Sequence, residues 1–340
     1  MDKIVIVKLS SLGDIIHTLP AFKLLRENFP SSEVIWIVEE SGREILEMVD
    51  GIDKIYTIDT KELRRGKKVV KNISKIRKLK RIKADILFDF QGTMKSAVVT
   101  SLINSKRKVG FSKKNLKEKT SLFFYKETVS YFEETEHVIR KNIHLLSSLN
   151  IYASTFSFPS FKYTKKLKND VKEKMKEIDM GKVIILNVGG GWETKRLDVK
   201  KWIDIAKGIV YRNFIPLILW GNDFEKKDAA KVALESGALL SPPFTLKELF
   251  PLIQDSLLLV SGDTLPLHIA EAVKTPTVSF FGPTLPSRNG PVNPISEVIL
   301  YELKCSGCFK RKCSNPICMN RIKSTDILKK VDLILSKIQK

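Results

Sequence analysis

Residues 3–20 read KIVIVKLSSLGDIIHTLP: a short apolar run, a polar turn and then a helix-like stretch. The β-branched run predicts a buried strand, and the apolar spacing from about residue 14 to 28 predicts a helix. A strand joined to a helix by a short polar loop is the building unit of a parallel α/β sheet. Asp14 lies at the N-terminus of that helix, where a carboxylate can cap the helix or act in catalysis.

The same alternation continues along the chain in two series. In the first series, further strands are expected at 33–39, 54–59 and 84–90. The second series predicts strands at 182–188, 215–220, 257–262 and 275–281, with helices around 199–212, 223–236 and 265–273. Residues 151–165 lack periodicity and are the expected hinge, and the tail 324–340 predicts a final amphipathic helix. This alternation of strands and helices therefore predicts an α/β fold of two Rossmann-like halves, a doubly wound arrangement in each.

Length and composition agree with two globular domains, because the chain has 340 residues and 43% of them are hydrophobic. No run approaches the roughly 18 consecutive apolar residues that a transmembrane helix needs. The chain begins a strand almost at once, and Lys8 interrupts the apolar run, which leaves no room for a signal peptide. We therefore expect a cytoplasmic protein.

The charge of the chain points to a polyanionic partner. The sequence holds 59 Lys and Arg against 38 Asp and Glu, a net charge of +21. Nucleic acid, a phospholipid surface and a phosphorylated glycolipid would each suit such a protein. Residues 60–83 are especially basic and carry apolar residues at helical spacing, but a merely solvated helix face explains them equally well. No RNA-recognition, zinc-finger or helix-turn-helix signature accompanies them.

Ligands of open α/β sheets bind at the carboxyl ends of the strands, so the loops there are the places to look for chemistry. The stretch SGDTLPLHIAEAV, residues 261–273, turns from a strand into a helix whose N-terminus can bind a diphosphate. The same sequence is also explained if Asp263 or Thr264 only caps the helix. His268 can reach a phosphate or be an ordinary buried histidine.

A glycine-rich loop follows the first strand of the second series. Gly189 and Gly190 let a ligand approach the backbone, and Lys195 or Arg196 can neutralise charge there. The loop matches neither the dinucleotide-binding nor the P-loop glycine pattern. Further on, the segment WGNDFEKKD, residues 220–228, places two acids after a strand, where they can accept ribose hydroxyls or simply suit a helix N-terminus.

The four cysteines follow the spacing C-x2-C-x4-C-x4-C near the C-terminus. In a cytoplasmic chain this cluster favours a small structural metal knuckle, while reduced thiols or one local disulfide remain alternatives. Its position beside the last helix indicates a structural role rather than a catalytic one. The cysteines concerned are Cys305, Cys308, Cys313 and Cys318.

Together these segments resemble the bacterial ADP-heptose:lipopolysaccharide heptosyltransferases. The resemblance rests on VKLSSLGDIIHTLPAF, WIVEE, DFQGTMKSA, the glycine-rich loop with Lys195, LWG and GDTLPLHIAEAV with VSFFGPT, which occur in the order of the family. Within the family, the chain is most similar to the members that act on Kdo.

The resemblance implies a GT-B fold, in which two Rossmann-like domains face each other across a cleft. It implies an acceptor domain at 1–155, a nucleotide-sugar domain at 165–322 and a last helix, 323–340, that returns to the first domain. The implied reaction moves L-glycero-D-manno-heptose from ADP-heptose to Kdo of the lipopolysaccharide inner core. It proceeds with inversion and with neither a cofactor nor a metal ion.

The resemblance also implies roles for single residues. Asp14 resembles the general base and Lys195 the partner of the diphosphate, and both are expected to be catalytic. The expected donor-binding residues are Gly189, Gly190, Glu225, Asp263, Thr264, Leu265 and His268. The expected acceptor-binding residues are Ser11, Gly13, Lys61, Arg64, Arg65 and Gln91. The family motif usually has glycine where this chain has Leu265. The leucine side chain is therefore expected to change the geometry of the donor site.

The expected partners are the ADP-heptose donor, the Kdo-lipid A acceptor and the anionic inner leaflet of the inner membrane, at which the surplus charge would hold the protein. No nucleic acid is expected. The alternative is a related transferase that uses another nucleotide sugar or adds heptose to a later core position. A more distant alternative is a basic protein without catalysis that binds nucleic acid or membrane; it would leave the ordered loop motifs unexplained.

Overall fold

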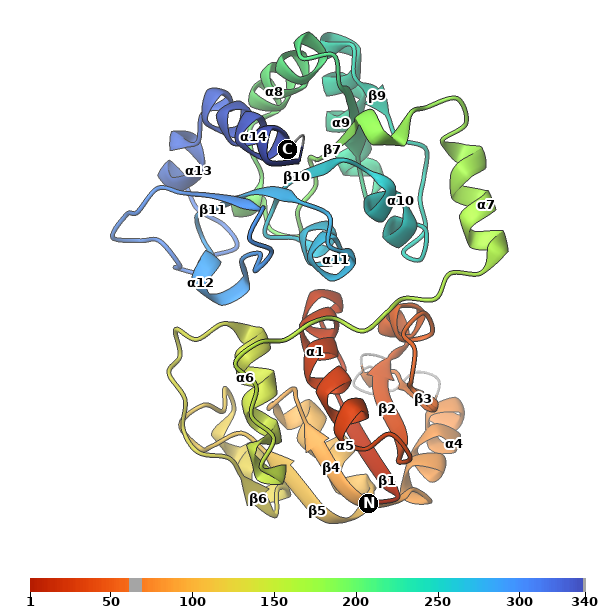
Figure 1. Ribbon diagram of the computed structural model, residues 1–340. Coiled ribbons are helices and arrows are strands. Elements are labelled where there is room, and N and C mark those ends of the chain that lie inside the picture. Colours follow the sequence, from red (N-terminus) through yellow and green to blue (C-terminus); the bar gives the residue numbers. More distant parts are fainter. Residues whose placement is uncertain (61–68, 339–340) are drawn as a thin grey trace. The chain divides into compact units, whose positions relative to one another are not determined.

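The computed structural model describes residues 1–60 and 69–338. The chain divides into two compact units, Met1–Lys162 and Tyr163–Lys340, so the division falls within the segment predicted as a hinge. Each unit has its own parallel sheet (Figure 1). Within the described residues, no helix combines the length and the apolar character needed to cross a membrane.

The first unit is built on a six-stranded parallel sheet in the order β3-β2-β1-β4-β5-β6. Its strands are β1 (Lys3–Val7), β2 (Glu33–Glu39), β3 (Lys54–Ile58), β4 (Lys83–Asp89), β5 (Asn104–Gly110) and β6 (Glu127–Thr128). Its helices are α1 (Leu12–Asn28), α2 (Arg43–Leu46), α4 (Val69–Lys80), α5 (Met94–Leu102) and α6 (Val138–His144), with 3-10 turns η1 (Glu40–Gly42), η2 (Lys119–Phe124) and η3 (Leu145–Leu149).

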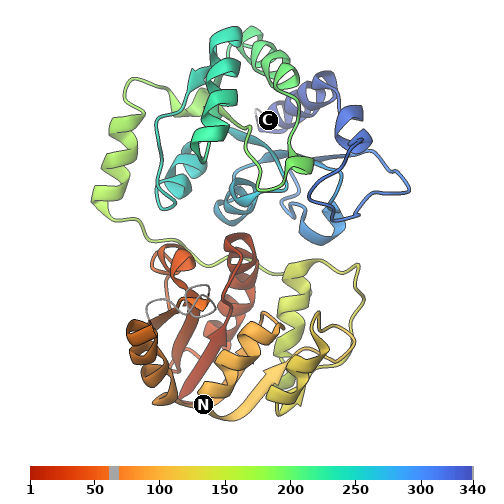
Figure 2. The ribbon, with the colours of Figure 1, turned by 180° about the vertical axis from the view of Figure 1, so that it is seen from behind.

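Helices cover both faces of this first sheet. Helices α1 and α6 pack on each other over one face, and α4 and α5 lie over the other, as the two opposite views show (Figures 1 and 2). Alternate strand residues serve the two layers. Val5, Val7 and Ile35 are buried with Leu79 and Val99 beneath α4 and α5. Burial on both faces explains why these strands read as continuous apolar runs rather than as an alternation.

The second unit repeats this design with a sheet in the order β12-β11-β10-β7-β8-β9, also parallel. Its strands are β7 (Val183–Asn187), β8 (Ile215–Leu219), β9 (Leu239–Leu240), β10 (Leu258–Gly262), β11 (Thr277–Phe281) and β12 (Glu297–Leu300). Its helices are α7 (Lys165–Lys174), α8 (Val199–Tyr211), α9 (Asp223–Ser236), α10 (Leu249–Asp255), α11 (Leu265–Val273), α12 (Pro286–Asn289), α13 (Ile317–Arg321) and α14 (Ser324–Ile338), with 3-10 turns η4 (Met180–Lys182) and η5 (Glu193–Lys195).

The last helix packs within the second unit. Helix α14 contacts α8 and β12, and Ile327, Val331 and Ile334 are buried in the same core as Trp202 of α8. The apolar spacing that predicted an amphipathic helix is therefore satisfied by this core. That the helix also returns to the first domain stays a prediction.

Both sheets have a switch point, the place at which the strand order reverses. It lies between β1 and β4 in the first unit and between β7 and β10 in the second, and both pairs are adjacent and parallel. In doubly wound sheets, ligands bind outside the carboxyl ends of the strands at this switch point. The loops after these four strands carry most of the predicted site residues.

Candidate functional site

In the first unit, the loop after β1 is held by the loop after β4. The buried Lys8 donates from Nζ to the carbonyl of Phe90 over 2.8 Å. The side-chain oxygen of Gln91 accepts from the backbone N–H groups of Leu9 and Ser10, each at 3.2 Å. Gln91, predicted to contact the acceptor, thus fixes the backbone that leads to Asp14.

The carboxylate of Asp14 caps helix α1. Its Oδ2 accepts from the backbone N–H of Ser11 at 3.0 Å and from the Ser11 hydroxyl at 2.9 Å, which forms a capping box. Asp14 and Gly13 are half-buried in the first turn, and Ser11 is exposed. The structural role of Asp14 is therefore present, and its role as a base stays a prediction. The two roles are compatible, because the helix dipole also favours the ionised carboxylate.

A charged network that reaches Ser10, in the loop after β1, was not among the predicted site residues. Glu39, buried at the end of β2, accepts from Nζ of Lys95 at 2.8 Å and from the hydroxyl of Thr60. Nζ of Lys95 also lies 3.3 Å from the hydroxyl of Ser10 in the loop after β1. The segments WIVEE and DFQGTMKSA contain these two charged residues, but nothing in either segment indicates that they pair. Lys61, Arg64 and Arg65, predicted to bind the acceptor, lie outside the described residues.

In the second unit, three polar side chains join the loops at the switch point. The side-chain amide of Asn187, at the end of β7, donates to the hydroxyls of Ser261 at 3.0 Å and Thr264 at 2.9 Å. The two hydroxyls also lie 2.9 Å apart. Thr264 thus holds its loop against β7 and makes no capping bond to helix α11, which begins at the half-buried Leu265. The predicted helix N-terminus is therefore present at the switch point.

Lys195, Asp263 and His268 form a compact polar cluster beside this helix N-terminus. Nζ of Lys195 donates to the Asp263 carboxylate at 2.7 Å and to its backbone carbonyl at 2.9 Å. Nε2 of His268 lies 3.4 Å from the other carboxylate oxygen. Lys195 also sits over the ring of Trp192, 4.4 Å from its centroid, a cation–π contact.

Lys195 and His268 influence the pKa of Asp263. Burial alone would raise its pKa, since its side chain is only 2% exposed. The hydrogen bond and charge of His268, together with the charge of Lys195, outweigh burial and hold the pKa of Asp263 well below its ordinary value. Asp263 is thus an anion that orients the ammonium group of Lys195.

Glu225 joins the glycine-rich loop to the start of helix α9. Its carboxylate accepts from the backbone N–H of Gly190 at 3.1 Å and of Gly221 at 2.8 Å, and Arg196 lies 3.6 Å away. A Cβ added to Gly189 would stand 2.4 Å from this carboxylate, so glycine is needed there for close approach. Glu225 therefore links the glycine-rich loop to the loop before α9, an arrangement that we call the Glu225 clip. Its predicted contact with the nucleoside stays a prediction.

The cysteines are free thiols. Cys305, Cys308 and Cys313 are exposed, and Cys318 is half-buried. Among residues 1–60 and 69–338, no three His, Cys, Asp or Glu side chains are already gathered as a metal site.

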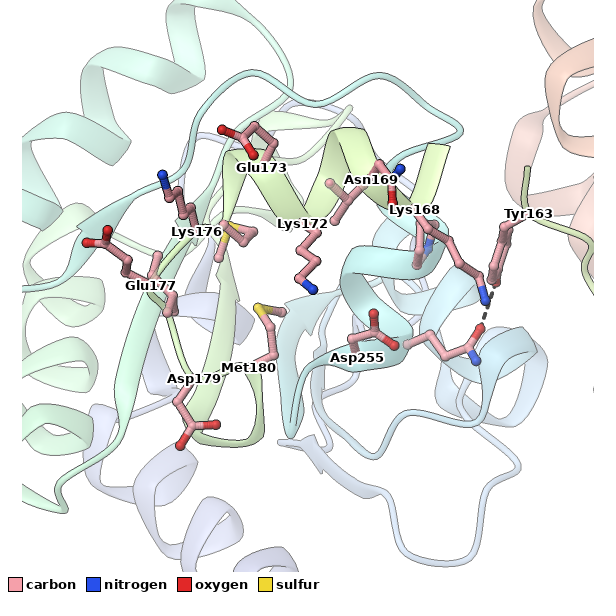
Figure 3. Close-up of a pocket in the computed structure, with 15 residues that line it drawn as sticks. Tyr163, Lys168, Asn169, Lys172, Glu173, Lys176, Glu177, Asp179, Met180 and Asp255 are labelled. Atoms are coloured by element: carbon pink, nitrogen blue, oxygen red, sulfur yellow. Dashed lines mark hydrogen bonds between the residues drawn. The ribbon is translucent and has the colours of Figure 1, made fainter. Parts of the chain in front are cut away.

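A groove of about 910 Å³ lies elsewhere in the second unit, between α7 and α10. Lys172 and Asp255 stand on opposite sides of it, and the hydroxyl of Tyr163 donates to Gln254 at its end (Figure 3). Burial raises the pKa of Asp255, and Lys168 only partly offsets this effect. The groove contains none of the predicted site residues. The predicted site residues therefore lie outside this groove.

Comparison with known proteins identifies the family of the chain. A model of glycosyltransferase family 9 (heptosyltransferase) matches residues 73–318. Lipopolysaccharide heptosyltransferase 1 of Campylobacter coli is 29% identical over 97% of this chain and 98% of that protein. The protein of the same name from Pseudomonas aeruginosa is 25% identical over 92% of this chain and 87% of its own.

Solved structures resemble the chain over almost its whole length. The Escherichia coli heptosyltransferase WaaC with ADP has a TM-score of 0.80 at 19% identity, covering 98% of this chain and 99% of that one. The E. coli ADP-heptose lps heptosyltransferase II has a TM-score of 0.78 at 14% identity, with coverage of 98% and 99%. These similarities confirm the predicted GT-B fold class.

Proposed function

The chain belongs to glycosyltransferase family 9, and from this premise we propose that it transfers heptose from ADP-heptose to the inner core of lipopolysaccharide. Its near full-length similarity to lipopolysaccharide heptosyltransferase 1 supports this substrate class. We further propose a Kdo residue as the acceptor. The observation that carries the proposal is the cluster of Lys195, Asp263 and His268 at a switch point, beside a helix N-terminus suited to a diphosphate.

The donor diphosphate would bind to the second unit. An ammonium group has three N–H donors, so Lys195 can keep its bonds to Asp263 and still donate to a phosphate oxygen. The start of α11 adds a positive dipole end at Leu265. The ribose would lie near Glu225, whose carboxylate has lone pairs beyond those that hold Gly190 and Gly221.

The transfer step follows from where charge moves. The acceptor hydroxyl oxygen attacks C1 of the heptose, the bond from C1 to the diphosphate breaks, and ADP leaves with the electron pair. Asp14 takes the proton of the attacking hydroxyl, and configuration at C1 inverts because attack and departure occur on opposite faces. Lys195 and the N-terminus of α11 stabilise the charge that grows on ADP, so this step needs no metal ion at the diphosphate.

The acceptor would bind to the first unit. Kdo carries a carboxylate, and we propose that Lys95 contacts it, because its ammonium group lies beside Ser10 in the loop that leads to Asp14. Glu39 holds Lys95 through an ion pair of 2.8 Å. The other proposed acceptor contacts are Ser11, Gly13, Gln91, Lys61, Arg64 and Arg65.

The cell location follows from charge. Lipid A is an anionic membrane lipid, and a chain with a net charge of +21 is attracted to an anionic leaflet. We propose that the protein works in the cytoplasm, peripherally at the inner face of the inner membrane.

The test is an acceptor comparison. The purified chain is incubated with ADP-heptose and either Kdo-lipid A or a heptose-terminated core, and acceptor mass and ADP release are measured. We expect the Kdo acceptor to gain one heptose. NMR should show that the anomeric configuration of the product is inverted relative to the donor. Transfer only to the heptose-terminated acceptor would assign the chain to a later core position. Transfer only from another nucleotide sugar would replace the proposed donor.

A further inference from the structure

Helix α6 holds helix α1 close to Asp14 through one buried amide. The side-chain N–H groups of Asn142 donate to the backbone carbonyl of His17 at 2.9 Å and to the hydroxyl of Thr18 at 3.2 Å. Asn142 is 2% exposed, and Thr18 is completely buried. An amide group has two N–H donors, and α1 supplies an acceptor for each of them. The two helices are thus joined by a satisfied polar contact away from water.

The hydrogen bonds continue from Thr18 to Asp14. The hydroxyl of Thr18 donates to the backbone carbonyl of Asp14 over 2.8 Å, one turn earlier in α1. A hydroxyl has one donor and two acceptor sites, so Thr18 can accept from Asn142 while it donates to Asp14. Two consecutive hydrogen bonds therefore join α6 to the residue proposed as the base. We call the pair of Asn142 and Thr18 the α6 brace.

The first turn of α1 has a reason to need support from another element. Pro20 lies inside the helix and has no N–H to donate to the carbonyl of Ile16. The helix therefore lacks one of the backbone bonds that would tie its first turn to the turns that follow. At the start of the helix, Asp14 is itself part of the cap, through Ser11. The α6 brace supports this turn from the side.

The choice of an amide at this position favours a role in positioning. The other buried residues of α6 are Ile139 and Ile143. An apolar side chain in place of Asn142 would avoid the cost of burying a polar group. A buried polar network whose members are all satisfied instead selects one arrangement of the elements that it joins. The α6 brace is therefore suited to fixing where the first turn of α1 lies.

We propose that Asn142 and Thr18 are positioning residues for Asp14. This inference rests on the proposed function, in which Asp14 takes the proton of the acceptor hydroxyl. A base must lie within hydrogen-bond reach of that proton, and a displacement of about 1 Å can cost about a hundredfold in rate. The brace fixes the backbone of Asp14, while Ser11 holds its carboxylate. Asn142 and Thr18 touch no substrate in this role, because both are buried.

Steady-state kinetics separate positioning from binding. Asn142→Ala and Thr18→Val should each lower kcat for heptose transfer by about tenfold or more, because each interrupts the hydrogen bonds that lead to Asp14. ADP affinity should stay at the wild-type value, since the donor is proposed to bind to the second unit. Thr18→Ser keeps the hydroxyl and should retain most of kcat. All rates are compared at one temperature, well below the thermal midpoint of every variant.

The matched control is Thr100→Val in α5. Thr100 is also completely buried, and its hydroxyl has no hydrogen-bond partner among the residues that the structure describes. The same substitution there removes a hydroxyl without breaking a hydrogen bond, so kcat should stay nearly unchanged. Wild-type kcat in Asn142→Ala and Thr18→Val would overturn the positioning role, even if their thermal midpoints fall. A kcat of Thr18→Ser as low as that of Thr18→Val would overturn the link through the hydroxyl.

Backbone hydrogen exchange tests the brace without heptose transfer. Peptides that cover residues 11–18 should exchange about tenfold or more faster in Asn142→Ala than in the wild type, because the first turn of α1 opens more often. Peptides from α5 should exchange equally in both proteins. Equal exchange of residues 11–18 would overturn the brace. A wild type that transfers no heptose would instead contradict the proposed function, and the exchange comparison would still decide whether Asn142 holds this turn.

Discussion

The buried pair of Lys195 and Asp263 sets the electrostatics of the donor site. Their side chains are 14% and 2% exposed, so water screens the pair little. Breaking such a pair costs about 3–5 kcal/mol, because the remaining charge is left buried without its partner. The pair therefore contributes both to the stability of the second unit and to the position of the ammonium group that would meet the diphosphate.

Replacing Asp263 by asparagine should reveal this pair through pH. The folded-state pKa of Asp263 lies below its ordinary value of 3.8, so its stabilisation is present above about pH 4 and is lost as pH falls further. We expect Asp263→Asn to lower the thermal midpoint at pH 7, with the difference from wild type shrinking below about pH 4.

The control for this comparison is Asp198→Asn, which alters an exposed carboxylate that caps helix α8. It should leave the thermal midpoint nearly unchanged at every pH, because asparagine caps a helix N-terminus about as well as aspartate. A difference between Asp263→Asn and wild type that stays constant from pH 7 to pH 3 would contradict the assigned pKa direction.

At the scale of elements, the glycine-rich loop is fastened to helix α9 by one carboxylate. Glu225 bonds the backbone of Gly190 and Gly221, and it can do so only because Gly189 leaves room. One side chain therefore links the loop, the end of β8 and the start of α9. Such cross-links help to preorganise a binding site.

Two neighbouring glycines give a matched test of this clip. Gly189→Ala would place Cβ 2.4 Å from the Glu225 carboxylate, whereas a Cβ at Gly191 meets nothing within 4 Å. We expect Gly189→Ala to destabilise the second unit by about 1–3 kcal/mol, the usual cost of overpacking, and Gly191→Ala to leave the thermal midpoint nearly unchanged. Equal midpoints for the two variants would show that the clip does not hold the loop.

Elements with clear ends could be predicted from the sequence. Helix α9 matches its predicted range because Asn222 caps its start and Gly237, with a φ of 76°, ends it. Strands β6 and β9 and the short helix α10 were not predicted, since each is too short to show a period. Lys195 and Asp263 follow β7 and β10, the strands predicted before them, while their roles stay predictions.

Networks that join distant loops could not be predicted. Lys95 and Glu39 are 56 positions apart, and Asn187 and Thr264 are 77 apart. One sequence shows which residues follow a strand, but it does not show which loops meet until the strand order is known. The same reason explains why Glu225 was expected at a nucleoside and not at the backbone of Gly190.

At the scale of the whole molecule, the net charge of +21 should govern membrane association. We expect the protein to bind vesicles that contain anionic phospholipid at low salt and to dissociate as ionic strength rises, because salt screens exposed charges. Co-sedimentation across a salt series measures this, with purely zwitterionic vesicles as the control. Equal binding to both kinds of vesicle would contradict an electrostatic attachment.

The central claim assigns different tasks to the two units: the first supplies the base and the second holds the donor. The most direct measurement compares ADP affinity, by calorimetry, with heptose transfer to Kdo-lipid A for Asp14→Ala and Lys195→Ala. Asp198→Ala, which removes a helix cap outside the proposed site, is the control for the lost capping box.

We predict that Asp14→Ala binds ADP as the wild type does and loses transfer by about a hundredfold or more, the usual effect of removing a general base. Lys195→Ala should lose both ADP affinity and transfer, and Asp198→Ala should keep both. Transfer by Asp14→Ala at the wild-type rate, with the protein folded, would contradict the assignment of the base and with it the division of tasks.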